Sequence, residues 1–585
     1  MQYNDRFLKQ NFTKFLVPSM LSVLGGTINV LVDDIMLAGK LGSEAIATLN
    51  ICMPIYLIIC TVGSLIGGGA AQITAAALGR EDSEKALYHY RLGMTLLAGL
   101  SLIITLVGLI TLNPLCQLLC KNFEYTGWVK DYLFWIFVGT LPKAMLYFPF
   151  NYLPIEGKNR QCSIVMLLML LGNVTFDFLF IYVWEGGMSG AGFASTLASL
   201  ISCVAGFVFL NTKKGMFKGF RPVRIEAKAC ENIVINGSPY ALNNLCSSLR
   251  LIVINYYMQF AGGADAVATF AAINSLNEFC LCIISGVPNT GASLLGVYYT
   301  EKNNRGIKMM LRIEYMCAVV LMALAGAMIV FQTPYWGKIF GGCVVDFYVT
   351  VPFALSLILA VVNNIMIVFF SRTGHVKIAD LITVCRLVIF VILGLLIFGA
   401  GERTRWLFLP AAEFFTCVIW LLTAIAVHAG NKNTSKILLL DRKLDEQGNV
   451  LDFSVAADDE HICEASEQIT QFCDEQDMGI SLTMKVSMAI EEILMVMKES
   501  CYEGKPEESF DIRVFALDQD IGMRIRCMGK HYNPLEALDD STDEKILGVR
   551  IINELAELVS YRSVLGANTL LLMFEKERKQ GENGV

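Results

Sequence analysis

One acidic side chain lies in the middle of a long apolar run. Residues 163–184 form a 22-residue apolar stretch whose single charge is Asp177, long enough for a helix to cross a bilayer. Asn173 precedes Asp177 by four residues, so a helix presents both side chains on one face. Charged groups in hydrocarbon usually face a bundle interior or a wet cavity, where they handle ions or protons. The alternative is a protonated carboxyl that only bonds to a neighbouring helix.

A second carboxylate, Asp34, lies near the end of the first apolar span, beside Asp33. Two carboxylates that face one cavity resist double ionisation, so the pair tends to hold a proton. Asn173 and Ser195 can bond either to the neutral acid or to a bound cation. Protonation would remove a charge and let the helices repack. The alternative for Asp34 is a solvated position at a helix end, and Asp33 is expected to be such a solvated neighbour.

The composition predicts two regimes in one chain. The 585 residues are 55% hydrophobic and only 17% charged, whereas the part after residue 430 is rich in charged residues. This pattern indicates a membrane domain followed by a soluble domain. No basic tract with interleaved aromatics favours nucleic acid. Eighteen cysteines without metal-site spacing and only five histidines argue against a metal centre, so no metal or other cofactor is expected.

Twelve apolar segments predict an all-α membrane domain of twelve transmembrane helices in two lobes of six. They lie near 15–38, 46–78, 87–112, 128–150, 163–184, 189–211, 234–260, 266–298, 309–332, 346–371, 378–400 and 405–429. The predicted organisation is an N-lobe (1–211), an inter-lobe loop (212–233), a C-lobe (234–430), a linker (431–449) and a soluble α+β domain (450–585), with helices on an antiparallel sheet.

The loop charges predict the orientation in the membrane. Eighteen Lys and Arg residues fall in loops on one side and six on the other, which places both termini and the tail in the cytoplasm. The N-terminus has no cleavable signal pattern. The first span is therefore expected to direct insertion.

The two predicted lobes repeat one another. Pro18 recurs as Pro239, and the segment 45–48 (AIAT) recurs as 266–269 (AVAT), each 221 residues later. The pair at 69–70 (GA) recurs at 291–292, before a charged loop in each lobe. Three matches in one order indicate duplication. Lobes of the same topology would be related by an axis along the membrane normal and would enclose a cleft.

Residues 34–42 (DIMLAGKLG), the Gly172-Asn173-x3-Asp177 pattern and the run 190–195 (GAGFAS) resemble multidrug and toxic compound extrusion (MATE) transporters. The resemblance covers about 10–430. It implies twelve helices in two lobes and secondary export driven by H⁺ or Na⁺. It also implies that Asp34, Asn173 and Asp177 form an ion-coupling site in the N-lobe, with Ser195 where the family often has threonine.

Other charged residues inside the predicted spans are open to two interpretations. Glu278 could belong to a C-lobe cation or substrate site, or it could pair with Arg250 one helix away as a structural bridge. Lys143 and Arg386 are long enough to reach the interface, and Asp380 lies near a helix start. These three are expected to be structural.

The tail alternates between strand and helix patterns. Strands are predicted at 450–456, 510–516, 521–527 and 568–574, and helices at 464–474, 481–500 and 546–559. The order, with the phrases AIEE and GKHYNPLE, resembles the histidine-kinase-like ATPase domain of anti-sigma factor serine kinases over about 450–577.

In that family a Glu-x3-Asn segment supplies a base and a magnesium ligand, an Asp-x-Gly segment holds adenine, and a later glycine turn accommodates phosphates. Here Glu492, Gly529 and Gly548 match, but Val496 and Cys527 replace the Asn and the Asp. Valine offers no oxygen to Mg²⁺, and a thiol is a poor partner for the adenine amine. The domain is therefore expected to be catalytically inactive, with ATP binding doubtful.

These patterns predict an antiporter of the bacterial inner membrane, not an enzyme. It would export small organic, cationic compounds in exchange for H⁺ or Na⁺, and its tail would regulate transport or bind a cytoplasmic protein. Its expected partners are the lipid bilayer, a small organic substrate and that regulatory protein. One alternative is a membrane-anchored nucleotide sensor or kinase-like signalling protein. Another is a flippase for lipid-linked substrates, which would favour a wide basic cavity.

Overall fold

The structure is a computed structural model of the chain. It describes residues 6–78, 82–120, 125–156, 158–211, 216–218, 222–300, 302–441, 450–476, 478–505, 508–516, 520–530, 532–533, 556–564 and 567–575. The chain forms two compact units. The helical unit comprises Ser19–Pro288 and Tyr315–Thr423, and the tail unit comprises Met1–Pro18, Asn289–Glu314 and Ala424–Val585.

The first half of the membrane part is mainly helical over its described length. Its helices are α1 (Arg6–Leu41), α2 (Ser43–Gly63), η1 (Ser64–Gly68), α3 (Gly69–Leu78), α4 (Ser83–Ile110), α5 (Leu112–Leu119), α6 (Thr126–Val138), α7 (Thr140–Met145), α8 (Tyr147–Ile155), α9 (Asn159–Asp177), η2 (Phe178–Val183) and α10 (Gly187–Leu210).

The second half is also helical. It contains α11 (Ala227–Ile284), α12 (Gly286–Thr300), α13 (Asn304–Phe331), α14 (Thr333–Ile339), α15 (Phe347–Arg372), α16 (Val376–Val384), η3 (Cys385–Ile389), α17 (Phe390–Phe398), η4 (Thr404–Leu407) and α18 (Phe408–Gly430).

Nine helices in the described part of the chain are long and apolar enough to cross a membrane, or ten if the bent pair Thr126–Val138 and Thr140–Ile155 counts as one span. One of the nine, Ala241–Ala292, is 52 residues long, far longer than the roughly 20 residues that one crossing needs. It is broken at Gly263, which has a left-handed φ of 61°. The prediction of a helical membrane protein is confirmed, and the count of twelve helices stays a prediction.

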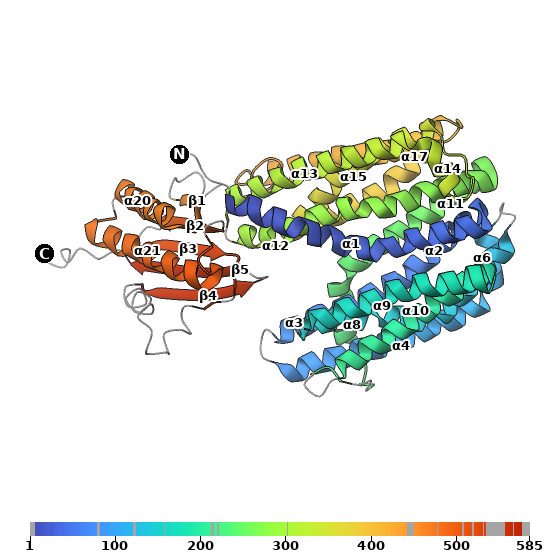
Figure 1. Cartoon of the computed structure of the whole chain (residues 1–585), viewed down its shortest axis with the longest axis horizontal. Helices are drawn as coiled ribbons and strands as arrows, with labels where there is room; N and C mark the ends of the chain where they lie inside the picture. The colour runs from blue at the N-terminus through green and yellow to red at the C-terminus, as the bar shows by residue number, and fades with distance from the viewer. Residues whose placement is uncertain are drawn as a thin grey trace. The chain divides into compact units, whose positions relative to one another are not determined.

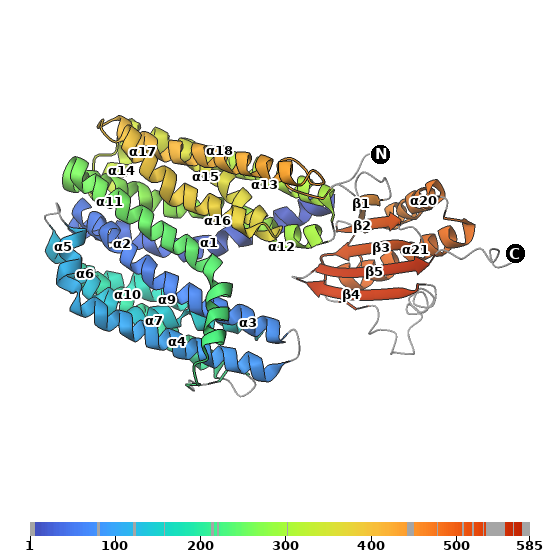
Figure 2. The same cartoon turned by 180° about the vertical axis from the view of Figure 1, so that it is seen from behind.

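The helices of the helical unit gather in two groups. Figure 1 shows α4, α8, α9 and α10 together on one side of this unit, α15 and α17 on the other, and α1 and α2 between them; Figure 2 shows the same grouping from behind. Helix α2 packs along α11. Helix α11 also approaches η1 closely near Gly237, where a Cβ would lie 1.8 Å from the Leu65 carbonyl oxygen.

The predicted repeat has a structural counterpart. Thr48 donates a hydrogen bond to the Glu44 carbonyl at 2.8 Å, and Thr269, 221 residues later, donates to the Asp265 carbonyl at 2.9 Å. Both threonines therefore sit one turn after an acidic residue on a helix and are buried. The two copies of the AIAT-like segment have the same local structure.

The soluble domain of the tail unit is a five-stranded antiparallel sheet in the order β1-β2-β3-β5-β4. Its strands are β1 (Val450–Ala456), β2 (Ser509–Ala516), β3 (Asp520–Cys527), β4 (Leu558–Val564) and β5 (Ala567–Glu575), and its helices are α20 (Asp459–Glu475) and α21 (Ile480–Tyr502). Both helices cover one face of the sheet (Figures 1 and 2). Apolar side chains of the sheet and both helices form one buried core.

Four strands and two helices of the soluble domain confirm the sequence prediction. The helix predicted at 546–559 is wrong at its end, because residues 558–559 begin β4 and pair with Leu572 and Met573 of β5. Alternating residues of β5 are buried. β4 lies at the edge of the sheet and adds a partner to β5.

Candidate functional site

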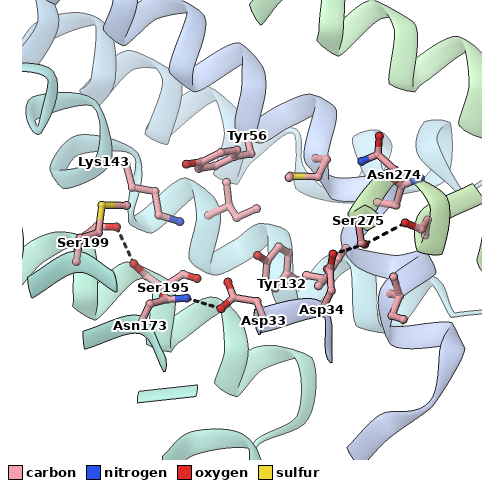
Figure 3. Close-up of a pocket in the computed structure, with 17 residues that line it drawn as sticks. Asp33, Asp34, Tyr56, Tyr132, Lys143, Asn173, Ser195, Ser199, Asn274 and Ser275 are labelled. Carbon is pink, nitrogen blue, oxygen red and sulfur yellow. Dashed lines mark hydrogen bonds between the residues drawn. The ribbon is translucent and has the colours of Figure 1, made fainter. Parts of the chain in front are cut away.

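A polar cleft lies within the helical unit. The space within it, including the part that is open to solvent, is about 750 Å³, and its charged lining residues are Asp33, Asp34 and Lys143. Polar side chains from several helices complete the lining: Asn50, Tyr56, Tyr132, Asn173, Ser195, Ser199, Asn274 and Ser275. Figure 3 shows these side chains converging from α1, α2, α6, α7, α9, α10 and α11.

Asn173 links two carboxyl groups at the edge of the cleft. Its amide nitrogen donates to Asp33 Oδ1 at 2.6 Å and to Asp177 Oδ2 at 3.0 Å, as Figure 3 shows for Asp33. Asn173 and Asp177 are almost fully buried. One buried amide therefore bridges two carboxyl groups that belong to different helices.

The expectation that Asp33 is a solvated neighbour is wrong, because Asp33 bonds to Asn173. Asp34 points elsewhere and accepts a hydrogen bond from the Ser275 hydroxyl (Figure 3). Consecutive residues of an α-helix point about 100° apart. The two aspartates of α1 therefore face different partners: Asp33 faces α9 of the N-lobe, and Asp34 faces α11 of the C-lobe.

Ser195 lies on the lining of the cleft, and its role in ion coupling stays a prediction. Its carbonyl accepts a hydrogen bond from Ser199 at 2.7 Å. Lys143 also lines the cleft, with its ammonium 5.8 Å from the centre of the Tyr56 ring. The expectation that Lys143 reaches the membrane interface is therefore wrong. The cleft combines two acidic side chains with one basic side chain.

The two lobes bond to each other beside the cleft. Asn50 of α2 donates to Asn255 Oδ1 at 2.6 Å, and Asn255 donates back to the Asn50 carbonyl at 2.8 Å. Both amides are buried. In the described part of the chain no group of three or more His, Cys, Asp or Glu residues could hold a metal ion. Reciprocal amide bonds therefore join α2 to α11 at the lining of the cleft.

The predicted C-lobe residues have mixed surroundings. Arg250 donates to Asn274 Oδ1 at 3.5 Å, which connects it to the lining of the cleft. Glu278 is half-buried and acts on Arg250 electrostatically. The described ion pairs do not include one between these two residues. The choice between a site residue and a structural bridge therefore stays open.

The expectation that Arg386 reaches the membrane interface is wrong, because Arg386 forms a buried ion pair. Its Nε lies 2.7 and 2.9 Å from the two carboxylate oxygens of Glu413, and Asn363 donates to Glu413 Oε2 at 2.7 Å. The sequence analysis overlooked Glu413, although a lone acid in the apolar span 405–429 is the same signal that singled out Asp177.

The predicted nucleotide residues of the tail that the structure describes differ in exposure. Glu492 is exposed, Val496 is half-buried and Cys527 is fully buried. Burial and a hydrogen bond to Cys501 raise the pKa of the Cys527 thiol, the hydrogen bond being the larger cause, and Asn568 donates to its sulfur at 3.7 Å.

A side chain at Gly529 would collide with the Cys501 carbonyl oxygen, 2.3 Å from the added Cβ. Gly548 lies outside the described residues. The Cys527 thiol is therefore engaged inside the domain.

Comparison with known proteins identifies relatives of the membrane part. Residues 18–179 match the family model MatE. The multidrug export protein MepA of Staphylococcus saprophyticus is 23% identical over 54% of this chain and 69% of its own length. The FAD transporter of Shewanella oneidensis is 25% identical over 44% of this chain and 58% of its own length. The probable multidrug resistance protein NorM of Halalkalibacterium halodurans is 21% identical over 54% and 70%.

Solved structures share the fold of the membrane part. An inward-facing multidrug resistance MATE transporter aligns with a TM-score of 0.64 at 19% identity, over 70% of this chain and 96% of that chain. An outward-facing MATE transporter aligns with a TM-score of 0.56 at 19% identity, over 74% and 100%. The membrane part therefore has the MATE fold, and the matches are to transporters and not to enzymes.

Proposed function

We propose that this protein is an antiporter that exports small organic compounds in exchange for a proton. The observation that carries the proposal is the hydrogen-bonded trio of Asp33, Asn173 and Asp177 at the edge of a polar cleft. A carboxyl pair that shares one proton changes its charge by one when that proton leaves. Because the pair joins α1 to α9, the charge change acts on the packing between these helices.

Asp34 connects this end of α1 to the C-lobe. Its carboxyl is bonded to Ser275 of the C-lobe, whereas its neighbour Asp33 is bonded within the N-lobe. A proton or cation that binds at this end of α1 therefore acts on contacts to both lobes. Alternating access, in which one lobe moves against the other around a central site, requires such a connection.

The test is transport in inverted membrane vesicles with proton and sodium gradients imposed separately. Asp177→Asn should abolish proton-driven uptake, while the protein remains folded and inserted. The matched control is Asp131→Asn, an exposed carboxyl on α6, which should transport normally. Retained proton-driven uptake by Asp177→Asn, or uptake driven by sodium alone in the unmodified protein, contradicts the proposal.

Lys143 bears on the class of cargo. Cationic compounds suit the two aspartates, but an ammonium group on the same lining also favours cargo with an anionic group, and one relative is a FAD transporter. The cargo panel should therefore include flavins as well as aromatic cations. Lys143→Met should lower transport of the anionic members and spare the cations. The flippase alternative required a wide basic cavity, and this lining does not support it.

We further propose that the tail regulates transport by holding the loop between α12 and α13. Tyr298 of α12 donates to Asp511 of β2 at 3.2 Å, and Arg526 of β3 bonds to the same carboxylate oxygen at 3.2 Å. The Arg526 guanidinium lies 5.1 Å from the centre of the Tyr298 ring. Both side chains are about 1% exposed. All of these residues belong to the tail unit.

Further contacts extend this interface. Arg513 donates to the Lys302 carbonyl at 3.3 Å, and Ser509 donates to Gln10 of α1 at 2.6 Å.

Tyr298→Phe should weaken the attachment of the tail, since a net hydrogen bond contributes about 1 kcal/mol. That free energy corresponds to a roughly fivefold increase in the rate of limited proteolysis. It should also change the transport rate. Tyr335→Phe, an exposed tyrosine on α14, is the control. Unchanged proteolysis and transport in Tyr298→Phe would remove the regulatory role.

The signalling alternative predicts that the full chain binds nucleotide. Failure to saturate with a millimolar ATP analogue would exclude that alternative, whereas saturable binding that Glu492→Ala weakens would support it.

A further inference from the structure

A second buried carboxyl lies in the C-lobe, on α13. Glu314 is 0% exposed, and neither of its carboxylate oxygens has a hydrogen-bond partner among the described residues. An ionised carboxylate without a partner is not tolerated away from water, so a group in this position takes its neutral form. Glu314 was not among the candidate residues predicted from the sequence.

The neighbouring helix is shaped to accept the side chain. A Cβ added at Gly291 of α12 would lie 2.0 Å from Glu314 Oε1, and 3.0 Å from Cγ and Sδ of Met310. The absence of a side chain at Gly291 therefore makes room for the carboxyl. The thioether and methylene groups of Met310 beside it are poor ligands for a hard cation, which prefers several oxygens. A proton needs no such ligands.

The N-lobe copy of this contact shows what the C-lobe has changed. The pair Gly69-Ala70 recurs as Gly291-Ala292, 222 residues later. In that register Glu314 corresponds to Leu92 of α4, which is fully buried. The C-lobe therefore has an acid where the N-lobe has a buried leucine.

The other charged groups near Glu314 do not neutralise it. Helix α12, which supplies Gly291, carries no Asp, Glu, Lys, Arg or His, and Tyr298 on its last turns is bonded to Asp511. On α13, the side chains of Lys308 and Arg312 are exposed. An ionised Glu314 would therefore need water to stabilise its charge.

We propose that Glu314 is a second proton-binding site, which holds a proton while α12 and α13 are packed at Gly291 and releases it to water when the two helices separate. On release, the O–H bond breaks, the electron pair stays on the carboxylate and the proton goes to water. That this proton contributes to transport rests on the function proposed above. That Glu314 is protonated in the packed state does not.

Infrared absorption of the purified full chain tests the protonation directly. The unmodified protein should show the C=O band of an unbonded carboxylic acid at pH 7. Glu314→Gln should remove that band, whereas Asp177→Asn and the exposed control Glu84→Gln should retain it. Absence of the band in the unmodified protein, or a band that Glu314→Gln leaves unchanged, overturns the proposal.

Gly291→Ala provides a second variant if Glu314→Gln does not fold. The added methyl should expel the carboxyl from its position against α12, so the band should disappear and a carboxylate signal should replace it. A band that persists unchanged in Gly291→Ala also overturns the proposal.

The release step is tested by the cargo concentration ratio across the vesicle membrane at which net transport stops under an imposed pH difference. With a difference of one pH unit, loss of one exchanged proton in Glu314→Gln should lower this ratio about tenfold. An unchanged ratio, with the infrared band lost, shows a permanently bound proton and overturns the release step. If the unmodified protein shows no proton-driven transport, the proposed function fails, and the infrared result still decides whether Glu314 holds a proton.

Discussion

Replacing Arg386 with methionine should destabilise the membrane part by about 3 to 5 kcal/mol, because it leaves the charge of Glu413 buried without its partner. Glu413 accepts two bonds from Arg386, at 2.7 and 2.9 Å, and one from Asn363 at 2.7 Å. The two charged side chains are only 13% and 12% exposed. The variant removes two of these three bonds, so the remaining amide must stabilise a full charge alone.

The double variant Arg386→Met with Glu413→Gln separates the ion pair from simple loss of packing. With the charge removed, most of the penalty should disappear, so the coupling energy should be about 2 kcal/mol or more. Unfolding of the purified protein in detergent measures each variant. The control is Arg372→Met, an exposed residue at the end of α15, which should change stability by less than about 0.5 kcal/mol. Additive effects of the two substitutions would refute the reasoning.

Three further predictions concern packing and the tail. Gly237→Ala should cost about 3 kcal/mol or more in the same unfolding assay, because its Cβ would lie 1.8 Å from the Leu65 carbonyl oxygen, which belongs to the backbone and cannot turn aside. Gly99→Ala, with nothing within 4 Å, should be neutral or stabilising and serves as its control. Asp458→Ala should expose the start of α20 to faster hydrogen exchange by about fivefold, since loss of the cap that Asp458 forms with the His461 amide at 3.0 Å costs about 1 kcal/mol. The hydrogen bond from the His461 ring to Asp458 raises the pKa of His461. That contact should therefore protect α20 below about pH 6.5 and lose its effect as the pH rises through the raised pKa, a trend that Asp458→Ala should remove.

The hydropathy and alternation patterns were sufficient for the secondary structure. Long apolar runs such as 163–184 form helices because a membrane leaves the backbone no other way to satisfy its polar groups. The tail strands at 450–456 and 521–527 match β1 and β3 within one residue, because alternating burial has a period of two that no helix can satisfy. The edge strand β4 was missed: its first two residues were assigned to the end of the predicted helix 546–559, and no element was predicted for 560–564.

The candidate site was only partly predictable. Sequence singled out Asn173 and Asp177 because a helix places residues four apart on one face, and the structure joins them by a 3.0 Å hydrogen bond. Which aspartate of α1 meets them was not predictable, because that depends on how α1 is rotated against α9. Sequence favoured Asp34, and the structure brings Asp33 to Asn173.

The sequence by itself determined that this chain has many apolar helices of membrane-spanning length and that a folded α+β domain follows them. These features depend on composition and on periods along one segment. Tertiary structure decided the surroundings of each polar group: Arg386 pairs with Glu413, Asp34 bonds to Ser275, and Glu314 lies against Gly291 without a hydrogen-bond partner among the described residues. Partners that lie tens or hundreds of residues apart are set by helix rotation and packing, and no local pattern encodes these.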